Sequence, residues 1–312
     1  MFSALIGKSP NFEAMIRSAK IIASTEVTVL LCGETGTGKE LLAKALQNHS
    51  PRAKKPFITL NCAALPESLV ESEMFGHRKG AFTGAVANQE GRLQAANSGT
   101  LFMDEIDSLP LSVQAKLLRF LESGDIQPVG GIYSQRVNVR IIAATNANVE
   151  EKITNGKFRK DLYYRINVVP LEIPPLRERK DDIELLLNYF FAHFSAIHRL
   201  PAPTLSKPAL TRLQEYGWPG NVRELRNLCE RLCVLLGGCH IEEKNLPEDI
   251  GRPPSKAGEF ILPERGIDLE QLEIDLIQQA LERAQDNRSQ TARLLGISRD
   301  TLLYRMKKYN MR

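Results

Sequence analysis

The first half of the chain alternates short apolar, β-branched runs with segments in which apolar residues recur at helical spacing. The runs that predict strands are 27–32, 56–61, 99–103, 139–145 and 168–173. Apolar strands separated by helices are typical of a parallel sheet that is covered on both faces. Ligand groups then gather at the carboxyl ends of the strands. The pattern predicts an α/β subdomain over residues 1–175, opened by a helix at about 11–23.

The second half of the chain reads as helices. Segments with helical spacing run from Asp181 to about Cys239, with interruptions at 201–208 and 217–220. Residues 251–266 contain three prolines and predict a linker. Beyond it, amphipathic segments predict helices at 269–284, 289–295 and 299–309. We therefore expect a helical subdomain over 176–250 and a small all-α domain over 267–312.

The overall composition is that of a globular protein, with 43% apolar and 25% charged residues in 312. No apolar run approaches the roughly 18 residues of a membrane span, and residues 1–10 lack the features of a signal peptide. Five cysteines without a C-x-x-C pair suit a reducing compartment. We expect a cytoplasmic protein without a membrane partner. We also expect Cys229, Cys233 and Cys239, which lie among leucines, to be buried core residues and not metal ligands.

Charge is concentrated at the end of the chain. From Asp286 onward there are seven basic and two acidic residues, so this tail carries +5 while the whole chain carries +4. A basic terminal module predicts a polyanionic partner.

A glycine-rich turn between the first strand and the next helix predicts a phosphate site. It matches the pattern of a P-loop, in which backbone N–H groups, a helix N-terminus and a lysine surround phosphate oxygens. Its residues are Gly33, Glu34, Thr35, Gly36, Thr37, Gly38 and Lys39. The next residue is Glu40, where the usual motif has a Ser or Thr that binds Mg²⁺. The metal must then depend on residues elsewhere.

The strand at 99–103 ends in two carboxylates, Asp104 and Glu105. Beside a P-loop this is a Walker B pattern, in which Asp104 would hold Mg²⁺ and Glu105 would polarise the attacking water. Acids also occur at strand ends as solvated loop residues. Asn61 and Asn146 end two other strands, and although each could be a turn former, both should face the same crevice.

Hydrolysis of a phosphoanhydride benefits from an arginine near the γ-phosphate. Arg159, Arg165 and Arg223 are the candidates. On sequence alone, a surface ion pair is the simpler interpretation of each.

The segment Gly80, Ala81, Phe82, Thr83, Gly84, Ala85 places one aromatic residue between glycines and small residues. A projecting Phe82 would indicate a protein partner. The alternative, which physical reasoning alone favours, is that Phe82 folds back into its own domain. His77 shows no ligand spacing, and we assign it no role.

The basic tail reads as a helix-turn-helix. Gly296 ends one helix and Ser298 caps the next. Ala292, Leu295, Ile297, Leu302 and Leu303 can form a shared core. The residues then available to the DNA major groove are Arg299, Thr301, Tyr304, Arg305 and Lys308.

Together these motifs resemble the central and C-terminal domains of bacterial enhancer-binding proteins, the AAA+ activators of sigma-54 RNA polymerase. The segment from Gly80 to Ala85 is identical to that family's loop signature, and the family is similar to this chain in having Glu after the P-loop lysine. The resemblance covers about residues 5–250, and the tail resembles the Fis-type DNA-binding domain.

The resemblance implies a role for each motif. Phe82 and Thr83 would contact sigma-54, and Asn61 would hold Glu105 in a nucleotide-dependent switch. Thr145 and Asn146 would sense the γ-phosphate. Further roles fall to three arginines: Arg159 and Arg165 would reach the neighbouring subunit's ATP, and Arg223 would be the sensor of the lid. Active members of the family are rings, usually hexamers.

Two functions are therefore expected from different classes. The first is an ATP-hydrolysing activator that binds upstream DNA and remodels the closed complex of sigma-54 RNA polymerase. The second is a nucleotide-responsive DNA-binding repressor that does no remodelling. The family's usual N-terminal regulatory domain has no counterpart in these residues, so either the sequence is a truncated piece or another protein supplies control.

Overall fold

The computed structural model describes residues 2–146, 148–247, 250, 266, 268–284, 287–309 and 311. They form two compact units, Met1–Pro253 and Pro254–Arg312. Most of the predicted linker lies outside the described residues.

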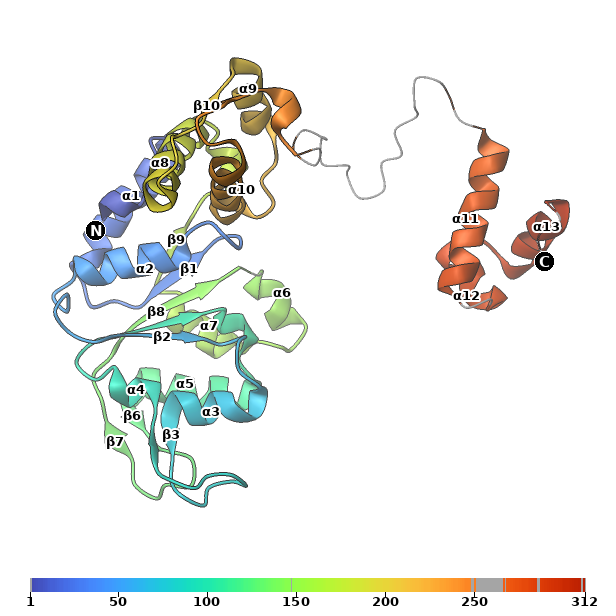
Figure 1. Cartoon of the computed structure of the whole chain (residues 1–312). Helices are drawn as coiled ribbons and strands as arrows, with labels where there is room; N and C mark the ends of the chain where they lie inside the picture. Colours follow the sequence, from blue (N-terminus) through green and yellow to red (C-terminus); the bar gives the residue numbers. More distant parts are fainter. Residues whose placement is uncertain are drawn as a thin grey trace. The chain divides into compact units, whose positions relative to one another are not determined.

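A five-stranded parallel sheet forms the centre of the first unit (Figure 1). Its order is β2-β5-β8-β1-β9, and every neighbouring pair is parallel. The strands are β1 (Val29–Cys32), β2 (Phe57–Asn61), β5 (Thr100–Asp104), β8 (Arg140–Thr145) and β9 (Val169–Glu172). All five predicted strands are present, and the α/β fold class is confirmed.

Alternate residues of these strands pack on opposite faces of the sheet, because successive side chains of a strand point to opposite sides. One face packs Leu31 and Ile142 against α1 (Pro10–Ala23) and α2 (Lys39–Asn48). The other packs Leu30 and Ile141 against the remaining helices of this subdomain. Those helices are α3 (Glu67–Phe75), α4 (Arg92–Ala95), α5 (Leu111–Ser123), α6 (Val149–Thr154) and α7 (Lys160–Ile166).

Two short antiparallel hairpins project beyond α3 and α5 (Figure 1). The first pairs β3 (Gly76–His77) with β4 (Gln89–Glu90), and the second pairs β6 (Asp125–Ile126) with β7 (Gln135–Arg136). They touch through backbone hydrogen bonds from Val129 N to the Gly76 carbonyl (2.8 Å) and from Arg78 N to the Val129 carbonyl (3.0 Å).

A helical subdomain follows the sheet. It contains α8 (Asp181–His198), α9 (Lys207–Glu215) and α10 (Asn221–Leu236), and a small parallel pair, β10 (Thr204–Leu205) and β11 (His240–Ile241). Its core surrounds Trp218, whose indole N–H donates to the Leu213 carbonyl (2.8 Å). Cys229 and Cys233 are buried here as predicted. The prediction was wrong for Cys239, which is exposed because α10 ends three residues earlier.

The second unit is a three-helix module of α11 (Leu269–Arg283), α12 (Arg288–Leu294) and α13 (Arg299–Lys308). Ile277, Leu281, Ala292, Leu302 and Met306 form its buried core. Gly296 takes a left-handed conformation (φ 64°) between α12 and α13, and the Ser298 hydroxyl accepts from Thr301 N (3.1 Å), as the sequence predicts. Among the described residues, no helix is long and apolar enough to cross a bilayer.

Candidate functional site

The turn between β1 and α2 has the backbone that a phosphate-binding loop requires. Gly36 (φ 82°) and Gly38 (φ 103°) both take left-handed conformations, which glycine adopts without a steric penalty. Lys39 begins α2, so the partly positive end of that helix lies at the turn. The Lys39 ammonium donates to the carbonyls of Gly33 (2.7 Å) and Glu34 (3.1 Å) and thus folds back over the loop.

The two carboxylates lie opposite this lysine at the end of β5. Burial lowers the pKa of Lys39, and the negative charges of Asp104 and Glu105 oppose that shift. The Asp104 carboxylate also accepts from the Glu105 backbone N–H (3.0 Å). Glu105 is left-handed (φ 52°), a strained conformation for a residue with a side chain. Strain of this kind is concentrated at functional sites, where surrounding packing holds it in place.

A pocket of about 590 Å³ unites most of the predicted nucleotide-binding residues. Its polar lining comes from the turn Thr35–Glu40 and from Asn61, Asp104, Glu105 and Arg223. Its apolar lining includes Ile6, Phe12, Met15, Ile173, Leu186 and Phe190. One pocket therefore joins a polar part, formed by the glycine-rich turn and the two carboxylates, to an apolar part.

The predicted asparagines have different partners. The Asn61 side-chain oxygen accepts from the backbone N–H groups of Ala63 (2.9 Å) and Ala64 (3.0 Å), so in this conformation Asn61 forms a turn. It lies beside Asp104 in the sheet register and lines the same pocket as Glu105. Asn146 instead donates to the Thr35 hydroxyl (3.0 Å) and so joins the end of β8 to the phosphate loop.

Thr145 belongs to a buried network behind the loop. Its hydroxyl donates to Asp107 (2.7 Å), and the Lys152 ammonium pairs with the same carboxylate at 2.5 Å. Sequence reasoning missed Asp107 and Lys152, because a single acid two residues after Glu105 carries no motif.

The helical subdomain holds the phosphate loop directly. The Arg177 guanidinium makes a two-pronged contact with the Glu34 carboxylate (2.8 and 2.7 Å), and the Asn221 amide donates to Glu34 (3.0 Å) and to the Thr35 carbonyl (3.1 Å). Chiefly because of the bond from Arg177, and then that from Asn221, the pKa of Glu34 is lowered. The Arg223 backbone N–H donates to the Gly36 carbonyl (3.3 Å).

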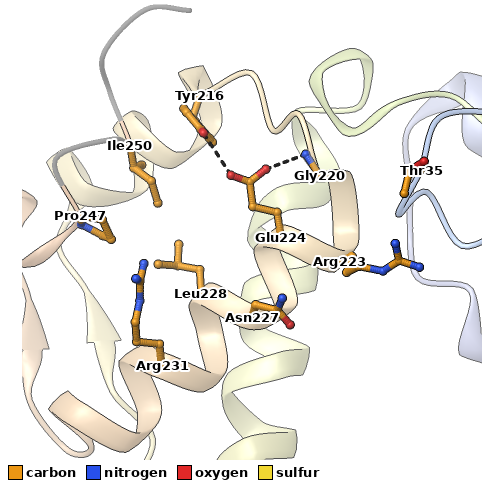
Figure 2. A pocket seen from close by; sticks show the side chains of 10 residues that line it. All are labelled: Thr35, Tyr216, Gly220, Arg223, Glu224, Asn227, Leu228, Arg231, Pro247 and Ile250. Atoms are coloured by element: carbon orange, nitrogen blue, oxygen red, sulfur yellow. Dashed lines mark hydrogen bonds between the residues drawn. The ribbon is translucent and has the colours of Figure 1, made fainter.

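A second pocket, of about 490 Å³, lies beside the contact between the phosphate loop and the helical subdomain, and most of its lining comes from that subdomain (Figure 2). The Glu224 carboxylate accepts there from the Tyr216 hydroxyl (3.1 Å) and from the Gly220 N–H (2.8 Å). Figure 2 shows the Arg223 side chain pointing away from these groups and towards Thr35. Arg223 therefore faces the phosphate loop, and its role as a sensor stays a prediction.

Arg159 and Arg165 are absent from the lining of the nucleotide pocket. Arg159 is exposed and makes a two-pronged pair with Asp161 (3.0 and 2.6 Å). Arg165 is also exposed and donates to the Leu121 carbonyl (2.8 Å from its terminal nitrogen). Neither arginine is brought to the chain's own phosphate loop.

The loop from Gly80 to Ala85 forms the tip of the first hairpin. Gly80 N donates to the Ala85 carbonyl (2.9 Å) and closes the tip, while Gly80 and Gly84 are left-handed. Phe82 is 37% exposed, and its ring lies edge-on to His77 with centroids 5.0 Å apart. Phe82 thus leans on its own hairpin and keeps an open face, and its protein partner stays a prediction. His77, to which we assigned no role, is buried and bonded to the Ser72 hydroxyl (2.7 Å).

In the C-terminal module the predicted DNA residues divide into two groups. Arg299 and Tyr304 are exposed on α13, and Tyr304 has 71% of its surface open. Arg305 pairs with Glu273 of α11, and Lys308 pairs with Glu270 (2.9 Å). The Thr301 hydroxyl is bonded to that of Ser298 (2.8 Å) in the helix cap.

Comparison with known proteins matches the whole architecture. The family described as the sigma-54 interaction domain matches residues 5–172, the AAA+ ATPase lid domain matches 177–259, and the Fis family of bacterial regulatory proteins matches 268–309. The regulatory protein AtoC of Escherichia coli K12 is 44% identical over 312 residues, covering 98% of this chain and 68% of that protein. The transcriptional regulatory protein ZraR of the same strain is 44% identical over 304 residues, covering 97% and 68%. This chain belongs to the sigma-54-dependent transcriptional activators.

Solved structures agree with this membership. The sigma-54 activator is similar to NtrX from Brucella abortus, with a TM-score of 0.75 at 32% identity, covering 98% of this chain and 69% of NtrX. A structure of NtrX with ATP matches with a TM-score of 0.73 at 32% identity, covering 97% and 68%. The activator is thus an AAA+ ATPase with a Fis-type DNA-binding module, and an ATP-responsive repressor is not favoured.

Proposed function

We propose that the activator binds ATP in the 590 Å³ pocket, with the phosphates on the turn 35–40 and the base among the apolar residues. One observation carries the assignment: phosphate loop, paired carboxylates and lid arginine line a single pocket. Lys39 supplies positive charge to the outer phosphates. Arg223, which faces the loop, reports the nucleotide to the helical subdomain, and Asn146 does so to β8.

The same site fits Mg²⁺. No group of three or more His, Cys, Asp or Glu side chains suited to a metal occurs in the described part of the chain. Mg²⁺ usually takes only one or two carboxylates and completes its shell with water and phosphate oxygens. Asp104 meets that requirement without the Ser or Thr that Glu40 replaces. The bound metal would neutralise charge that develops on the phosphates.

Glu105 is the proposed catalytic carboxylate. At the strand end its side chain lines the pocket, where it can orient a water molecule for in-line attack on the γ-phosphorus. Asn61 lies on the adjacent strand and is the proposed switch partner that restrains Glu105 in another nucleotide state. Asp104 remains with the metal and does not compete for the water.

Arg159 and Arg165 are proposed to act on the ATP of a neighbouring protomer. The proposed assembly is a ring of identical copies of this chain arranged head to tail. Two features support this: both are exposed, and neither lines the pocket of its own chain. Head-to-tail contacts generate rings, and a hexamer is the proposed closed form.

The remaining surfaces bind the macromolecular partners. The open face of Phe82, together with Thr83, is proposed to contact sigma-54 in the polymerase holoenzyme. The exposed side of α13, with Arg299 and Tyr304, is proposed to enter the major groove of an upstream DNA site. Bound DNA raises the local concentration of the activator near the promoter in the cytoplasm.

Open-complex formation with ATP tests the loop assignment. Thr83→Ala should retain ATP hydrolysis and lose open-complex formation, because Thr83 lies outside the nucleotide pocket. Full activation by this variant would refute the assignment of the loop. If the protein were a repressor that only binds DNA, the parent protein would form no open complexes either.

Glu105→Ala tests the chemistry. It should bind ATP and hydrolyse it about 10²- to 10⁴-fold more slowly, since it removes the group that activates water. A rate of hydrolysis near that of the parent would exclude Glu105 as the catalytic carboxylate. If neighbouring protomers complete the site, the rate of ATP hydrolysis per subunit of the parent should rise with protein concentration.

A further inference from the structure

Gln114 is a buried polar side chain that no part of the ATPase site uses directly. It lies on α5 with no exposed surface. Its amide nitrogen donates to the carbonyls of Leu109 (2.7 Å) and Lys157 (3.1 Å), and its amide oxygen accepts from the backbone N–H of Arg159 (2.8 Å). All three partners are backbone groups, so Gln114 fixes the course of the chain and not the orientation of a side chain.

These three bonds join two segments with different tasks. Leu109 lies five residues beyond Asp104, at the end of the segment that carries the catalytic carboxylates. Lys157 and Arg159 lie in the turn before α7, and Arg159 is the residue at the N-terminal cap of that helix. The Arg159 side chain is exposed and does not anchor its own backbone in the core. Phe158, the residue before it, is buried in the core, and Gln114 adds the hydrogen bond that holds the Arg159 backbone N–H itself.

We infer that Gln114 is a positioning residue for Arg159, and that it sets the place from which this arginine reaches the ATP of the adjoining subunit. The inference rests on the proposed action of Arg159 across the subunit interface. A rigid base is needed there because misplacement of a catalytic group by about 1 Å can reduce a rate about 10²-fold. Gln114 thus serves the active site of the neighbour and leaves the nucleotide pocket of its own chain intact.

Gln114→Met tests this by removing all three hydrogen bonds at nearly constant side-chain length. Purified full chain carrying the change should hydrolyse ATP at least about 10-fold more slowly than the parent. A 1:1 mixture with Glu105→Ala should then recover activity, because Gln114→Met subunits keep a working pocket and Glu105→Ala subunits keep a well-placed Arg159. Random mixing in a head-to-tail ring makes about one quarter of the interfaces competent.

Two controls separate the explanations. Arg159→Ala mixed with Glu105→Ala should recover in the same way. Gln47→Met removes a second buried glutamine that also donates to backbone carbonyls, those of Arg52 (2.6 Å) and Lys55 (3.3 Å), but that has no contact with the turn before α7. It should lower the thermal unfolding temperature while hydrolysis per folded subunit stays close to that of the parent.

The outcomes are distinct. Recovery with Arg159→Ala but none with Gln114→Met would place the action of Gln114 in its own pocket and overturn the inference. Normal hydrolysis by Gln114→Met alone would also overturn it. Absence of recovery with Arg159→Ala would refute the proposed action across the interface, and the role of Gln114 with it. If Gln114→Met does not fold, Gln114→Asn, which keeps the amide but shortens its reach, is tested in the same mixtures with the same expected recovery.

Discussion

The substitution Gly36→Ala, which adds one methyl group, should disrupt the contact between the phosphate loop and the helical subdomain. A Cβ atom there would lie 2.2 Å from the Gly220 carbonyl oxygen and 3.1 Å from the Arg223 Cβ. The nearer atom belongs to the backbone, so it cannot move aside by a change of rotamer. Gly36→Ala must therefore shift the loop or push the start of α10 away from it.

Gly38→Ala provides the matched control. Gly38 is also left-handed, but among the described residues no atom beyond its neighbours in the chain lies within 4 Å of the position its Cβ would take. Both variants carry the backbone strain of a left-handed alanine, about 1–2 kcal/mol. Only Gly36→Ala adds an overpacked contact, which costs typically about 1–3 kcal/mol. We expect a loss in unfolding free energy of about 1–2 kcal/mol for Gly38→Ala and about 2–5 kcal/mol for Gly36→Ala.

Urea unfolding without nucleotide measures this difference and avoids any clash between the new methyl group and a phosphate. Trp218 is the only tryptophan in the chain, is fully buried, and lies two residues before Gly220. Its fluorescence therefore reports on the subdomain that the contact affects, and the free energy follows from linear extrapolation. Equal losses for the two alanine variants would refute the reasoning, because the close approach to Gly220 would then carry no energy.

Three further predictions concern charge and backbone strain. Arg177 holds the pKa of Glu34 below its ordinary value of 4.5 in the folded protein. The ionised carboxylate therefore stabilises the folded parent above about pH 4.5. This stabilisation is lost as the pH falls through the pKa that Glu34 has in the folded protein. The gap in urea midpoint between the parent and Glu34→Gln should therefore close on acidification through that window, and a constant gap would contradict it. Glu105→Gly should be more stable than Glu105→Ala by about 1 kcal/mol, because glycine relieves the left-handed strain. An alanine is usually the more stabilising of the two residues, so thermal unfolding of the two variants tests this prediction. Fluorescence anisotropy titrations give the slope of log affinity for DNA against log salt concentration. Arg299→Ala should reduce the magnitude of this slope by about 0.9 if Arg299 neutralises one phosphate. Lys308→Ala should leave the slope nearly unchanged, because the Lys308 ammonium is paired with α11.

The sequence predicted the features that depend on local pattern. The central strands β1, β5 and β8, which are buried on both faces, appear as apolar runs, so their positions could be predicted from the chain. The order of the strands in the sheet could not. The phosphate loop could also be predicted, because left-handed positions such as Gly36 and Gly38 require glycine whatever the rest of the fold does. The cap at Ser298 followed from the same kind of local rule.

Contacts between distant segments could not be predicted. Arg177 and Glu34 are 143 positions apart, and Asn221 and Glu34 are 187 apart, so no spacing in the sequence relates them. The sequence also does not show which side of a helix packs against the rest of the protein. Arg305 and Lys308 are predicted to contact DNA because both are basic residues on the last helix, and the sequence does not show that each also pairs with an acid of α11. His77 has no ligand spacing because its partners are Ser72 and an aromatic ring.

Backbone hydrogen bonds join the two hairpins, so a displacement of one tip should carry the other tip with it. Ile132 and Tyr133, at the turn of the second hairpin, are 86% and 85% exposed, and a Cβ at Gly130 in the same turn would lie 2.8 Å from the Cβ of Ala81. A rotation that lifts Phe82 must either break the hydrogen bonds at Val129 or carry Tyr133 through the same arc. If ATP hydrolysis lifts Phe82, Ile132 and Tyr133 would be displaced with it, and any surface that receives Phe82 would need room for both hairpin tips.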